Sequence, residues 1–187
     1  MATTADFRNG FTFVEGGDLF TIIEFLHVKP GKGGAFVRTK LRNIKTKAVI
    51  ERTYRSGEKF EEVRLEQRPF EYLYHDGQFY VFMSTETYEQ IHIDGDLIGE
   101  GVRFLTDNSP AGILFHGDTP IEVELPTFVE LEVTRADPGV RGNTAQNATK
   151  PVTVSTGAEV YVPLFVEEGT VIKIDTRSGQ YIERVNK

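Results

Sequence analysis

The stretch of the chain with the clearest chemical potential is a glycine-rich segment around one lysine. Residues 29–34 read Lys29-Pro30-Gly31-Lys32-Gly33-Gly34, after an apolar run that ends near His27 and before an alternating run that begins at Ala35. Glycines permit a backbone turn with positive φ and leave no side chains beside the lysine. We therefore expect a hairpin tip from which Lys32 projects alone and can place a cation inside a narrow cavity.

Two phosphate-binding interpretations of this segment fail. A P-loop needs four residues between its first glycine and a Gly-Lys-Ser/Thr, followed by a helix whose N-terminus faces the phosphate. Lys32 is followed by glycines and then by a strand pattern. The same pattern excludes a dinucleotide-binding fingerprint. Without further information, an ordinary exposed turn remains the alternative to a functional tip.

Catalytic and metal-binding constellations are missing from the sequence. The four histidines, at positions 27, 75, 92 and 116, do not pair at metal-ligand spacing, and the chain has no cysteine. No serine stands in a nucleophile motif. Asp94-Gly95-Asp96 lacks the later ligands of a calcium loop and predicts a turn with a helix cap. We expect no catalytic residue, no metal and no cofactor, hence a protein that is not an enzyme; a β-barrel hydrolase or transferase is the alternative.

Charge is distributed very unevenly along the 187 residues, whose formal net charge is -7. Residues 1–64 carry 12 basic and 8 acidic side chains, residues 65–126 carry 2 and 12, and residues 127–187 carry 7 and 8. Nine bases and a single acid fall within residues 29–55. A solvated face is one explanation, but asymmetry of this size also steers one region of a molecule toward phosphate.

Period-two alternation dominates the secondary-structure signals. From Ala35 to Leu41 small and apolar residues alternate with Phe36, Arg38, Lys40 and Arg42, which predicts a strand with one basic face. Further strands are predicted at Phe20–Phe25, Lys47–Tyr54, Phe70–Tyr74, Phe79–Met83, Ile121–Leu125, Phe128–Val133, Val152–Val154, Val160–Phe165, Val171–Ile174 and Tyr181–Val185. His75-Asp76-Gly77-Gln78 predicts a hairpin turn.

Helical signals are limited to Ser84–Ile91 and Asp96–Leu105. We expect an all-β chain of three small β-barrels in tandem, with domains at residues 1–64, 65–126 and 127–187. The N-terminus lacks a signal-peptide layout and the apolar runs are too short to cross a bilayer, so a cytoplasmic protein with no membrane contact is expected.

Three motifs resemble the bacterial elongation factor P family. Val28–Val37 is similar to the family's lysine-bearing loop, and Glu71–Gly77 is similar to its second-domain hairpin. The long C-terminal stretch that includes Val162–Val166 and Val171–Tyr181 is similar to the family signature. The resemblance covers essentially the whole chain. It implies a KOW-like N-terminal barrel followed by two OB-type barrels in an elongated L.

The resemblance also implies a function. Members of the family bind the ribosome between the peptidyl and exit sites, beside peptidyl-tRNA, and relieve stalling at consecutive prolines. Lys32 would reach toward the peptidyl-transferase centre, near the CCA-end phosphates, usually lengthened by a lysine-modifying enzyme; the eukaryotic relative carries hypusine. Arg38, Lys40 and Arg42 would face tRNA or ribosomal RNA. Such a monomer would act by positioning the reactants.

The third domain contributes weaker predictions from the same resemblance. Gly142-Asn143-Thr144 falls where the family often has Gly-Asp-Thr, in a loop near exit-site mRNA. Asn143 keeps an acceptor but loses the charge. Tyr181 and Arg184 are candidate tRNA-stem contacts, with strand packing and a solvated rim as their alternatives. An elongation-factor-P-like paralogue and a general OB-fold RNA-binding protein remain alternatives for the whole chain.

Overall fold

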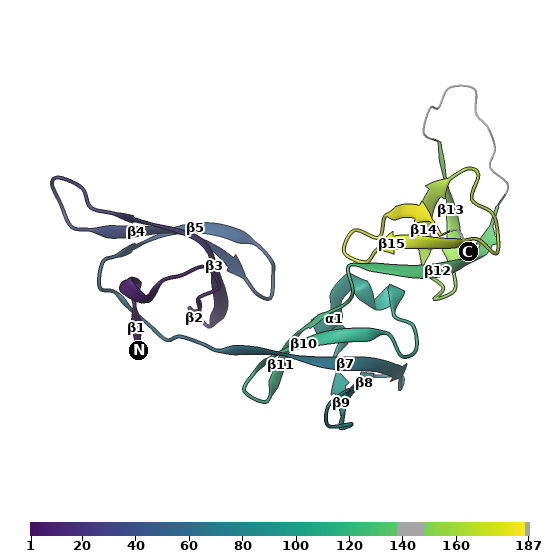
Figure 1. The fold of residues 1–187 in the computed structure, drawn as a ribbon, viewed down its shortest axis with the longest axis horizontal. Coiled ribbons are helices and arrows are strands. Elements are labelled where there is room, and N and C mark those ends of the chain that lie inside the picture. The colour runs from purple at the N-terminus through teal and green to yellow at the C-terminus, as the bar shows by residue number, and fades with distance from the viewer. Residues whose placement is uncertain (138–147, 186–187) are drawn as a thin grey trace. The chain divides into compact units, whose positions relative to one another are not determined.

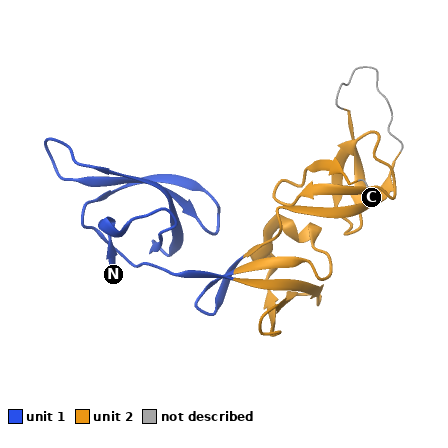
Figure 2. Ribbon diagram, viewed as in Figure 1, with its two compact units in different colours: residues 1–67, 114–122 blue, residues 68–113, 123–187 orange. Residues whose placement is uncertain are grey.

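The computed structural model of the chain describes residues 1–137 and 148–185. Strands make up most of the regular structure in this part of the chain (Figure 1). The chain divides into two compact units, residues 1–67 with 114–122 and residues 68–113 with 123–187 (Figure 2). The expected all-β class is confirmed. The domain boundaries near residues 64 and 126 and the L-shaped outline stay predictions.

The N-terminal part of the first unit is a twisted sheet with a short second sheet. Its elements are β1 (Ala2–Thr3), η1 (Thr4–Asp6), β2 (Thr12–Glu15), β3 (Asp18–Val28), β4 (Phe36–Asn43), β5 (Val49–Arg55) and β6 (Lys59–Phe60). The main sheet has the order β2-β3-β4-β5, and β1 pairs with β6. The long β3–β4 hairpin runs from the pair Phe20–Asn43 to the pair Val28–Phe36, which brings the chain to the lysine-bearing loop.

The core of this part is built from aromatic rings. Phe7, Phe13, Tyr54 and Phe60 pack with centroid separations of 4.9 to 6.1 Å, in tilted, stacked and edge-to-face arrangements. Phe13 is completely buried. Offset and edge-to-face aromatic pairs contribute beyond the apolar area they bury. A dense aromatic core therefore supports the sheet from which the β3–β4 hairpin extends.

A carboxylate joins the two edge strands of the main sheet. Glu15 on β2 forms an ion pair with Arg52 on β5 and accepts a hydrogen bond of 3.1 Å from the Tyr54 hydroxyl. Burial, followed by the neighbouring Glu15 charge, raises the pKa of Tyr54 above its ordinary value, so the phenol remains a donor at neutral pH. We call Glu15, Arg52 and Tyr54 the edge clasp.

The middle part of the chain contains β7 (Leu65–His75), β8 (Tyr80–Ser84), β9 (Gln90–Ile93), α1 (Gly95–Ile98), η2 (Gly99–Phe104), β10 (Pro110–His116) and β11 (Thr119–Glu124). Their sheet has the order β11-β10-β7-β8-β9. The predicted turn after His75 is confirmed: Asp76 accepts hydrogen bonds from the backbone of Gln78 and Phe79, and Gly77 has a φ of 100°. Asp94 caps α1 by accepting from Asp96 N–H at 2.9 Å, as expected.

The predicted helix over Ser84–Ile91 is wrong. Ser84 ends β8, and its hydroxyl accepts hydrogen bonds from the backbone of Glu86 and Thr87. Tyr88 then adopts a left-handed φ of 61°, and β9 begins at Gln90. A side chain that satisfies local backbone N–H groups competes with a helix, and a left-handed residue ends one. The segment is therefore a hairpin connection, whereas Asp96–Leu105 does contain the helical elements α1 and η2.

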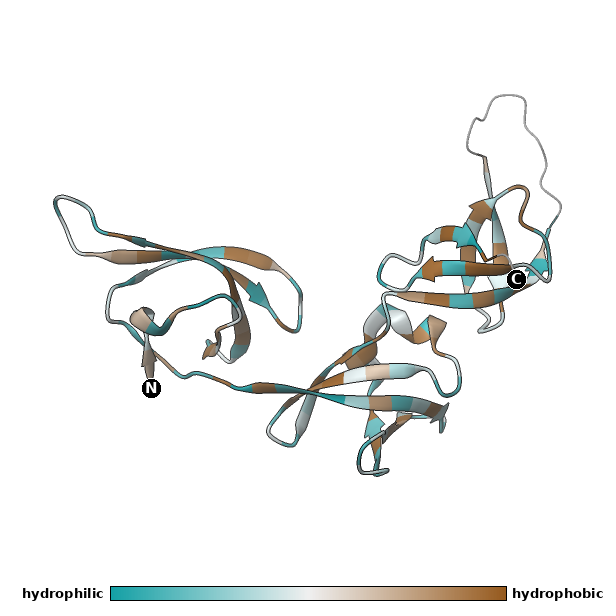
Figure 3. Cartoon of the chain, in the orientation of Figure 1, coloured by the Kyte–Doolittle hydropathy of each residue, from teal (hydrophilic) through white to brown (hydrophobic). Residues whose placement is uncertain are grey.

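The C-terminal part contains β12 (Phe128–Ala136), β13 (Thr149–Val154), β14 (Glu159–Pro163), β15 (Val171–Asp175) and β16 (Tyr181–Arg184), in the sheet order β14-β13-β12-β15-β16. Hydrophobic and hydrophilic residues alternate along these strands (Figure 3). The core is mainly valine and isoleucine, with Val133, Val162 and Ile172 completely buried. Phe104 of η2, 1% exposed, belongs to the same core cluster.

Candidate nucleic-acid interface

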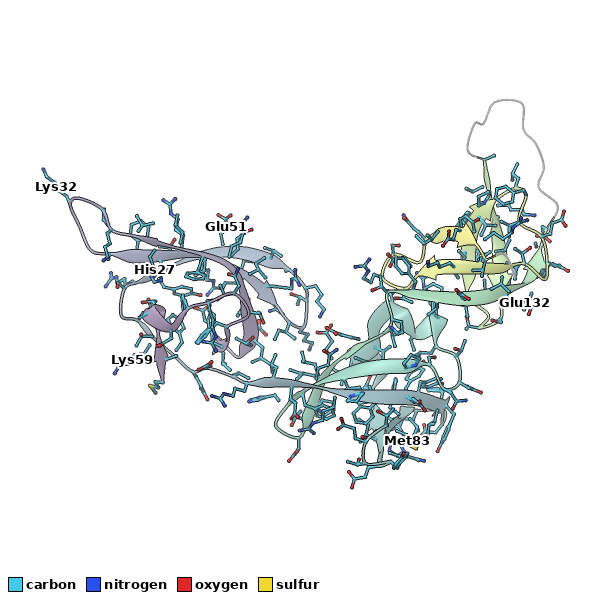
Figure 4. All side chains as sticks on the ribbon, in the orientation of Figure 1. His27, Lys32, Glu51, Lys59, Met83 and Glu132 are labelled. Atoms are coloured by element: carbon cyan, nitrogen blue, oxygen red, sulfur yellow. The ribbon has the colours of Figure 1, made fainter. Side chains whose placement is uncertain are left out.

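The loop between β3 and β4 holds Lys32 at its end (Figure 4). Gly33 has a φ of 109°, which L side chains rarely adopt. Gly31 and Gly34 do not have positive φ, and a Cβ added to either would meet no atom within 4 Å. The expectation that the flanking glycines turn the backbone through positive φ therefore holds for Gly33 and is wrong for Gly31. Gly31 and Gly34 leave open space beside the lysine.

The Lys32 side chain is presented to solvent without a partner. The residue is exposed, and its ammonium makes no hydrogen bond or ion pair with any residue in the described ranges. Lys29 and Pro30 lie beside it in the exposed loop. A lysine ammonium is a compact point charge on a flexible stem. The loop therefore offers an uncompensated cation beyond the edge of the β3–β4–β5 sheet.

The predicted basic strand face is present on β4. Val37, Thr39 and Leu41 are buried, whereas Arg38 and Arg42 are exposed on the opposite face. The Arg38 guanidinium lies 5.7 Å from the centre of the Phe36 ring, a cation–π contact that keeps it near the tip loop. The alternation read from the sequence therefore positions the arginines as expected.

Lys40 lies on the same face but is paired. Its ammonium donates to Glu24 Oε2 on β3 at 3.0 Å. The hydrogen bond to Glu24 and the charge of that carboxylate, with a smaller effect of Glu51, raise the pKa of Lys40. A bulge at Ile23 shifts the β3 register between Ile22 and Glu24, which puts Glu24 directly opposite Lys40.

The ion pairs divide the bases of residues 29–55 into two groups. Carboxylates hold Lys40, Lys47 and Arg52, through Glu24, Glu122 and Glu15 respectively. The bases that make no ion pair with a described residue are Lys29, Lys32, Arg38, Arg42, Lys45 and Arg55. We call this second set the free bases. A base without an ion-pair partner is available to neutralise a phosphate and to release the counterion condensed on the nucleic acid there.

Sequence reasoning missed the acids that make this division. Glu15, Glu24 and Glu122 are distant in sequence from the bases they pair with, and strand register brings Glu24 to Lys40. The Ile23 bulge has no glycine or other local signal to announce it. Strict alternation along β3 does not place Glu24 opposite Lys40. That pairing could be predicted only if the bulge at Ile23 were known.

Tyr181 and Arg184 lie on β16, where another bulge brings them onto one face. Three positions apart, they would point to opposite sides of a regular strand. Tyr181 stands opposite Ile174 and Arg184 opposite Ile172, because Ile182 is the extra residue between them. Tyr181 packs partly buried against the barrel core, whereas Arg184 is exposed. Gly142, Asn143 and Thr144 lie outside the described residues.

The histidines are dispersed in the described ranges. His27 lies on β3 beside the Phe25 ring, His75 contacts Tyr80, and His92 contacts Phe79 and lies 3.7 Å from Asp76. Within residues 1–137 and 148–185, no three His, Cys, Asp or Glu side chains come together in a group that could hold a metal ion. No described helix is long and apolar enough to span a membrane.

Comparison with known families accounts for nearly the whole chain. The model of the elongation factor P KOW-like domain matches residues 3–60, that of the elongation factor P OB domain matches residues 65–123, and that of the elongation factor P C-terminal domain matches residues 129–184. These matches define a translation factor built from small β-barrel domains. They confirm the expected KOW-like and OB-type architecture.

Curated relatives agree with the family models. An elongation factor P from Caldanaerobacter subterraneus subsp. tengcongensis is 54% identical over 99% of this chain and 100% of its own length. Elongation factor P 1 from Porphyromonas gingivalis is 53% identical, and elongation factor P from Mycobacterium avium is 48% identical, each over the full length of both chains. The chain belongs to the elongation factor P family of translation elongation factors.

Solved structures show the same fold at low sequence identity. Translation initiation factor 5A from Methanococcus jannaschii is 22% identical, covers 65% of this chain and 94% of its own, and superposes with a TM-score of 0.50. A translation initiation factor 5A family protein from Naegleria fowleri is 13% identical, covers 66% and 96% respectively, and gives a TM-score of 0.54.

Proposed function

We propose that this elongation factor binds the ribosome between the peptidyl and exit sites, beside peptidyl-tRNA, and stimulates peptide-bond formation at consecutive prolines. The observation that carries the proposal is the uncompensated Lys32 at the end of the β3–β4 loop (Figure 4), together with the exposed Arg38 and Arg42 on β4. Family membership and the resemblance of the tip loop supply the ribosomal context.

The protein acts in this proposal without chemistry of its own. Proline is a poor nucleophile in this setting, so the reaction suffers when peptidyl-tRNA is misplaced. A cation held near the CCA-end phosphates restricts the tRNA end to productive geometries, and such positioning lowers a barrier without an acid, base or nucleophile. The protein is accordingly a monomeric cytoplasmic factor and not an enzyme, and a lysine-modifying enzyme extends the reach of Lys32.

The remaining contacts follow from the same arrangement. Arg38, Lys40 and Arg42 face tRNA or ribosomal RNA, with Lys40 contributing less because Glu24 already pairs with it. Tyr181 and Arg184 contact a tRNA stem, and Gly142, Asn143 and Thr144 lie near exit-site mRNA. The three functional parts correspond to residues 1–64, 65–126 and 127–187.

A polyproline reporter tests the tip. Lys32→Ala should abolish rescue of a stalled reporter while the protein stays folded, because the reaching cation is lost. Lys59→Ala removes an exposed lysine from β6, outside the basic stretch of residues 29–55, and serves as the matched control, with rescue expected near wild type. Normal rescue by Lys32→Ala would exclude the proposed mechanism.

A salt titration tests the face behind the tip. Binding of the full chain to an RNA hairpin should weaken with salt, and Arg38→Gln or Arg42→Gln should each reduce the slope of log affinity against log salt by about one. Arg52→Gln should change the slope much less, since Glu15 already neutralises Arg52. Equal slopes for all three variants would exclude the assignment of the interface.

A further inference from the structure

The outward face of the β3–β4–β5 sheet carries its side chains in cross-strand rows. Leu26, Arg38 and Thr53 form one row, Glu24, Lys40 and Glu51 the next, and Thr21, Arg42 and Val49 the third. The row of Glu24, Lys40 and Glu51, here named the acidic row, thus lies between two arginines. Figure 4 shows Glu51 on the side of the sheet away from η1.

The acidic row has a net negative charge in the middle of a face that is otherwise basic. Lys40 donates to Glu24 at 3.0 Å, so one charge of each sign cancels. Glu51 is exposed, and its carboxylate accepts no hydrogen bond from a described residue. Carboxylates are acceptors only. A phosphate opposite this row would be repelled, and the group that does fit there must donate hydrogen bonds.

The spacing of the arginines defines what surrounds that donor. Arg38 and Arg42 are four residues apart on β4, which corresponds to about 13 Å along a strand. A hollow of about 430 Å³ lies beside Arg38, and Glu24, Lys40 and Glu51 also line it, as does Arg52. The face therefore matches a polymer that presents phosphates on two sides and hydroxyl donors in between.

An A-form RNA helix has this order of groups across its minor groove. That groove is wide and shallow, displays the 2′-hydroxyls, and is bordered by the two phosphate backbones. We propose that Glu24 and Glu51 accept hydrogen bonds from 2′-hydroxyls in the minor groove of an RNA stem whose flanking phosphates are held by Arg38 and Arg42. The acidic row then determines specificity for RNA, a role that rests on the proposed binding of RNA at this face.

The test compares two hairpins of identical sequence, one with ordinary ribose and one with 2′-fluoro ribose. The 2′-fluoro stem keeps A-form geometry and phosphate charge but has no 2′ donor. Fluorescence anisotropy with the full chain at low salt gives the ratio of the two affinities. Wild type should prefer the ribose hairpin, and Glu24→Ala or Glu51→Ala should each lower that preference about two- to tenfold, the usual range for one hydrogen bond.

Matched variants separate hydrogen bonding from net charge. Glu132→Ala removes an exposed acid from β12, far in sequence from this face, and should leave the ratio unchanged. Glu24→Gln keeps an acceptor oxygen and should retain more of the ratio than Glu24→Ala. Both alanine variants should bind the 2′-fluoro hairpin more tightly than wild type does, because a negative charge beside phosphate is gone and no hydrogen bond to that stem is lost.

Three outcomes would overturn the proposal. Failure of wild type to bind either hairpin would refute it together with the RNA-binding face of the proposed function. Equal binding of the two hairpins by wild type would refute the recognition of 2′-hydroxyls by the acidic row, while the proposal that this face binds RNA would stand. A wild-type preference that survives both alanine substitutions would assign that preference to groups outside the acidic row.

Discussion

The β3–β4 loop and the β15–β16 turn both join antiparallel strands and both contain a basic residue within two positions of a glycine, yet only one of the two bases is paired. Arg177 donates to Asp175 at 2.9 Å, and Asp175 also accepts from the backbone N–H groups of Arg177 and Ser178. Lys32 has no such carboxylate in its loop. In a turn that contains an acidic residue, the base forms an ion pair within the turn. In a turn without one, the base remains available to bind a partner.

The barrels behind these two turns also differ. The N-terminal core is a cluster of phenylalanine and tyrosine rings, whereas the C-terminal core is mainly valine and isoleucine. Large rings fill a small barrel with few side chains, and removing one leaves a large cavity. Stability in the N-terminal barrel is thus concentrated in few residues, while in the C-terminal barrel it is spread over many.

The largest expected effect comes from this difference in cores. Phe13→Ala should destabilise the N-terminal barrel by about 3–5 kcal/mol, and Ile172→Val should destabilise the C-terminal barrel by about 0.5–1.5 kcal/mol. Both side chains are completely buried. Hydrogen exchange resolved by residue measures each barrel in the intact chain. Similar losses in both would contradict the contrast between concentrated and distributed cores.

A smaller effect is expected at the turn glycines. Gly179 has a φ of 70°, and an added Cβ would lie 2.4 Å from Arg103 Nη2, whereas a Cβ on Gly33 would meet only Pro30 Cγ at 3.9 Å. Gly179→Ala should cost about 1–2 kcal/mol through backbone strain and must also displace the arginine. Gly33→Ala should affect barrel stability less, because its loop is free to adjust. Exchange rates in the two hairpins compare the variants.

The edge clasp should contribute about 1 kcal/mol, near the upper end for a partly exposed ion pair. Glu15→Gln weakens the bonds to Arg52 and Tyr54, so exchange should accelerate in β2 and β5. Glu61→Gln removes the same charge from an exposed side chain with no hydrogen bond to a described residue and is the control. Equal effects of the two substitutions would mean that the clasp is not stabilising.

The smallest effect is a pH dependence of the β15–β16 turn. Hydrogen bonds from the Arg177 side chain and backbone lower the pKa of Asp175 to about 2 from its ordinary value of 3.8. Because the folded pKa is depressed, the carboxylate stabilises the turn above about pH 4, and that contribution disappears as the pH falls toward 2.

A carboxyl titration by NMR measures the Asp175 pKa directly. Asp175→Asn should weaken the turn at pH 7, and its difference from wild type should vanish near pH 2. Asp118→Asn, at a side chain without a hydrogen bond to a described residue, should show no such convergence. An ordinary pKa at Asp175 would contradict the pairing with Arg177.

Local sequence predicts most of the strands and the basic face of β4. Each predicted strand overlaps an observed one, and the alternation around Arg38 and Arg42 gives the basic face directly. The errors arise where side chains or register act over distance. Hydrogen bonds accepted by the Ser84 hydroxyl and the left-handed backbone of Tyr88 give a hairpin connection where a helix was expected. The bulges at Ile23 and Ile182 put residues on faces that strict alternation would not predict.

Local sequence also could not predict which bases form ion pairs. Lys40 and Arg38 have the same periodicity and the same exposed side of β4, but only Lys40 has a glutamate across the strand pair. Such a distinction depends on register between strands that are many residues apart. The sequence pattern therefore predicts that this face of β4 is positively charged, and the fold determines which of its bases have no ion-pair partner.

The C-terminal barrel depends on Phe104, a residue that precedes its own strands in the sequence. This ring fills the core of a barrel whose own strands begin at Phe128, and Thr156 donates to the Arg103 carbonyl at 2.7 Å beside it. A piece cut at residue 127 would start with a vacancy the size of a phenyl ring. During synthesis Phe104 emerges from the ribosome before the C-terminal strands whose core it completes. Exchange of C-terminal barrels between relatives would have to carry η2 along.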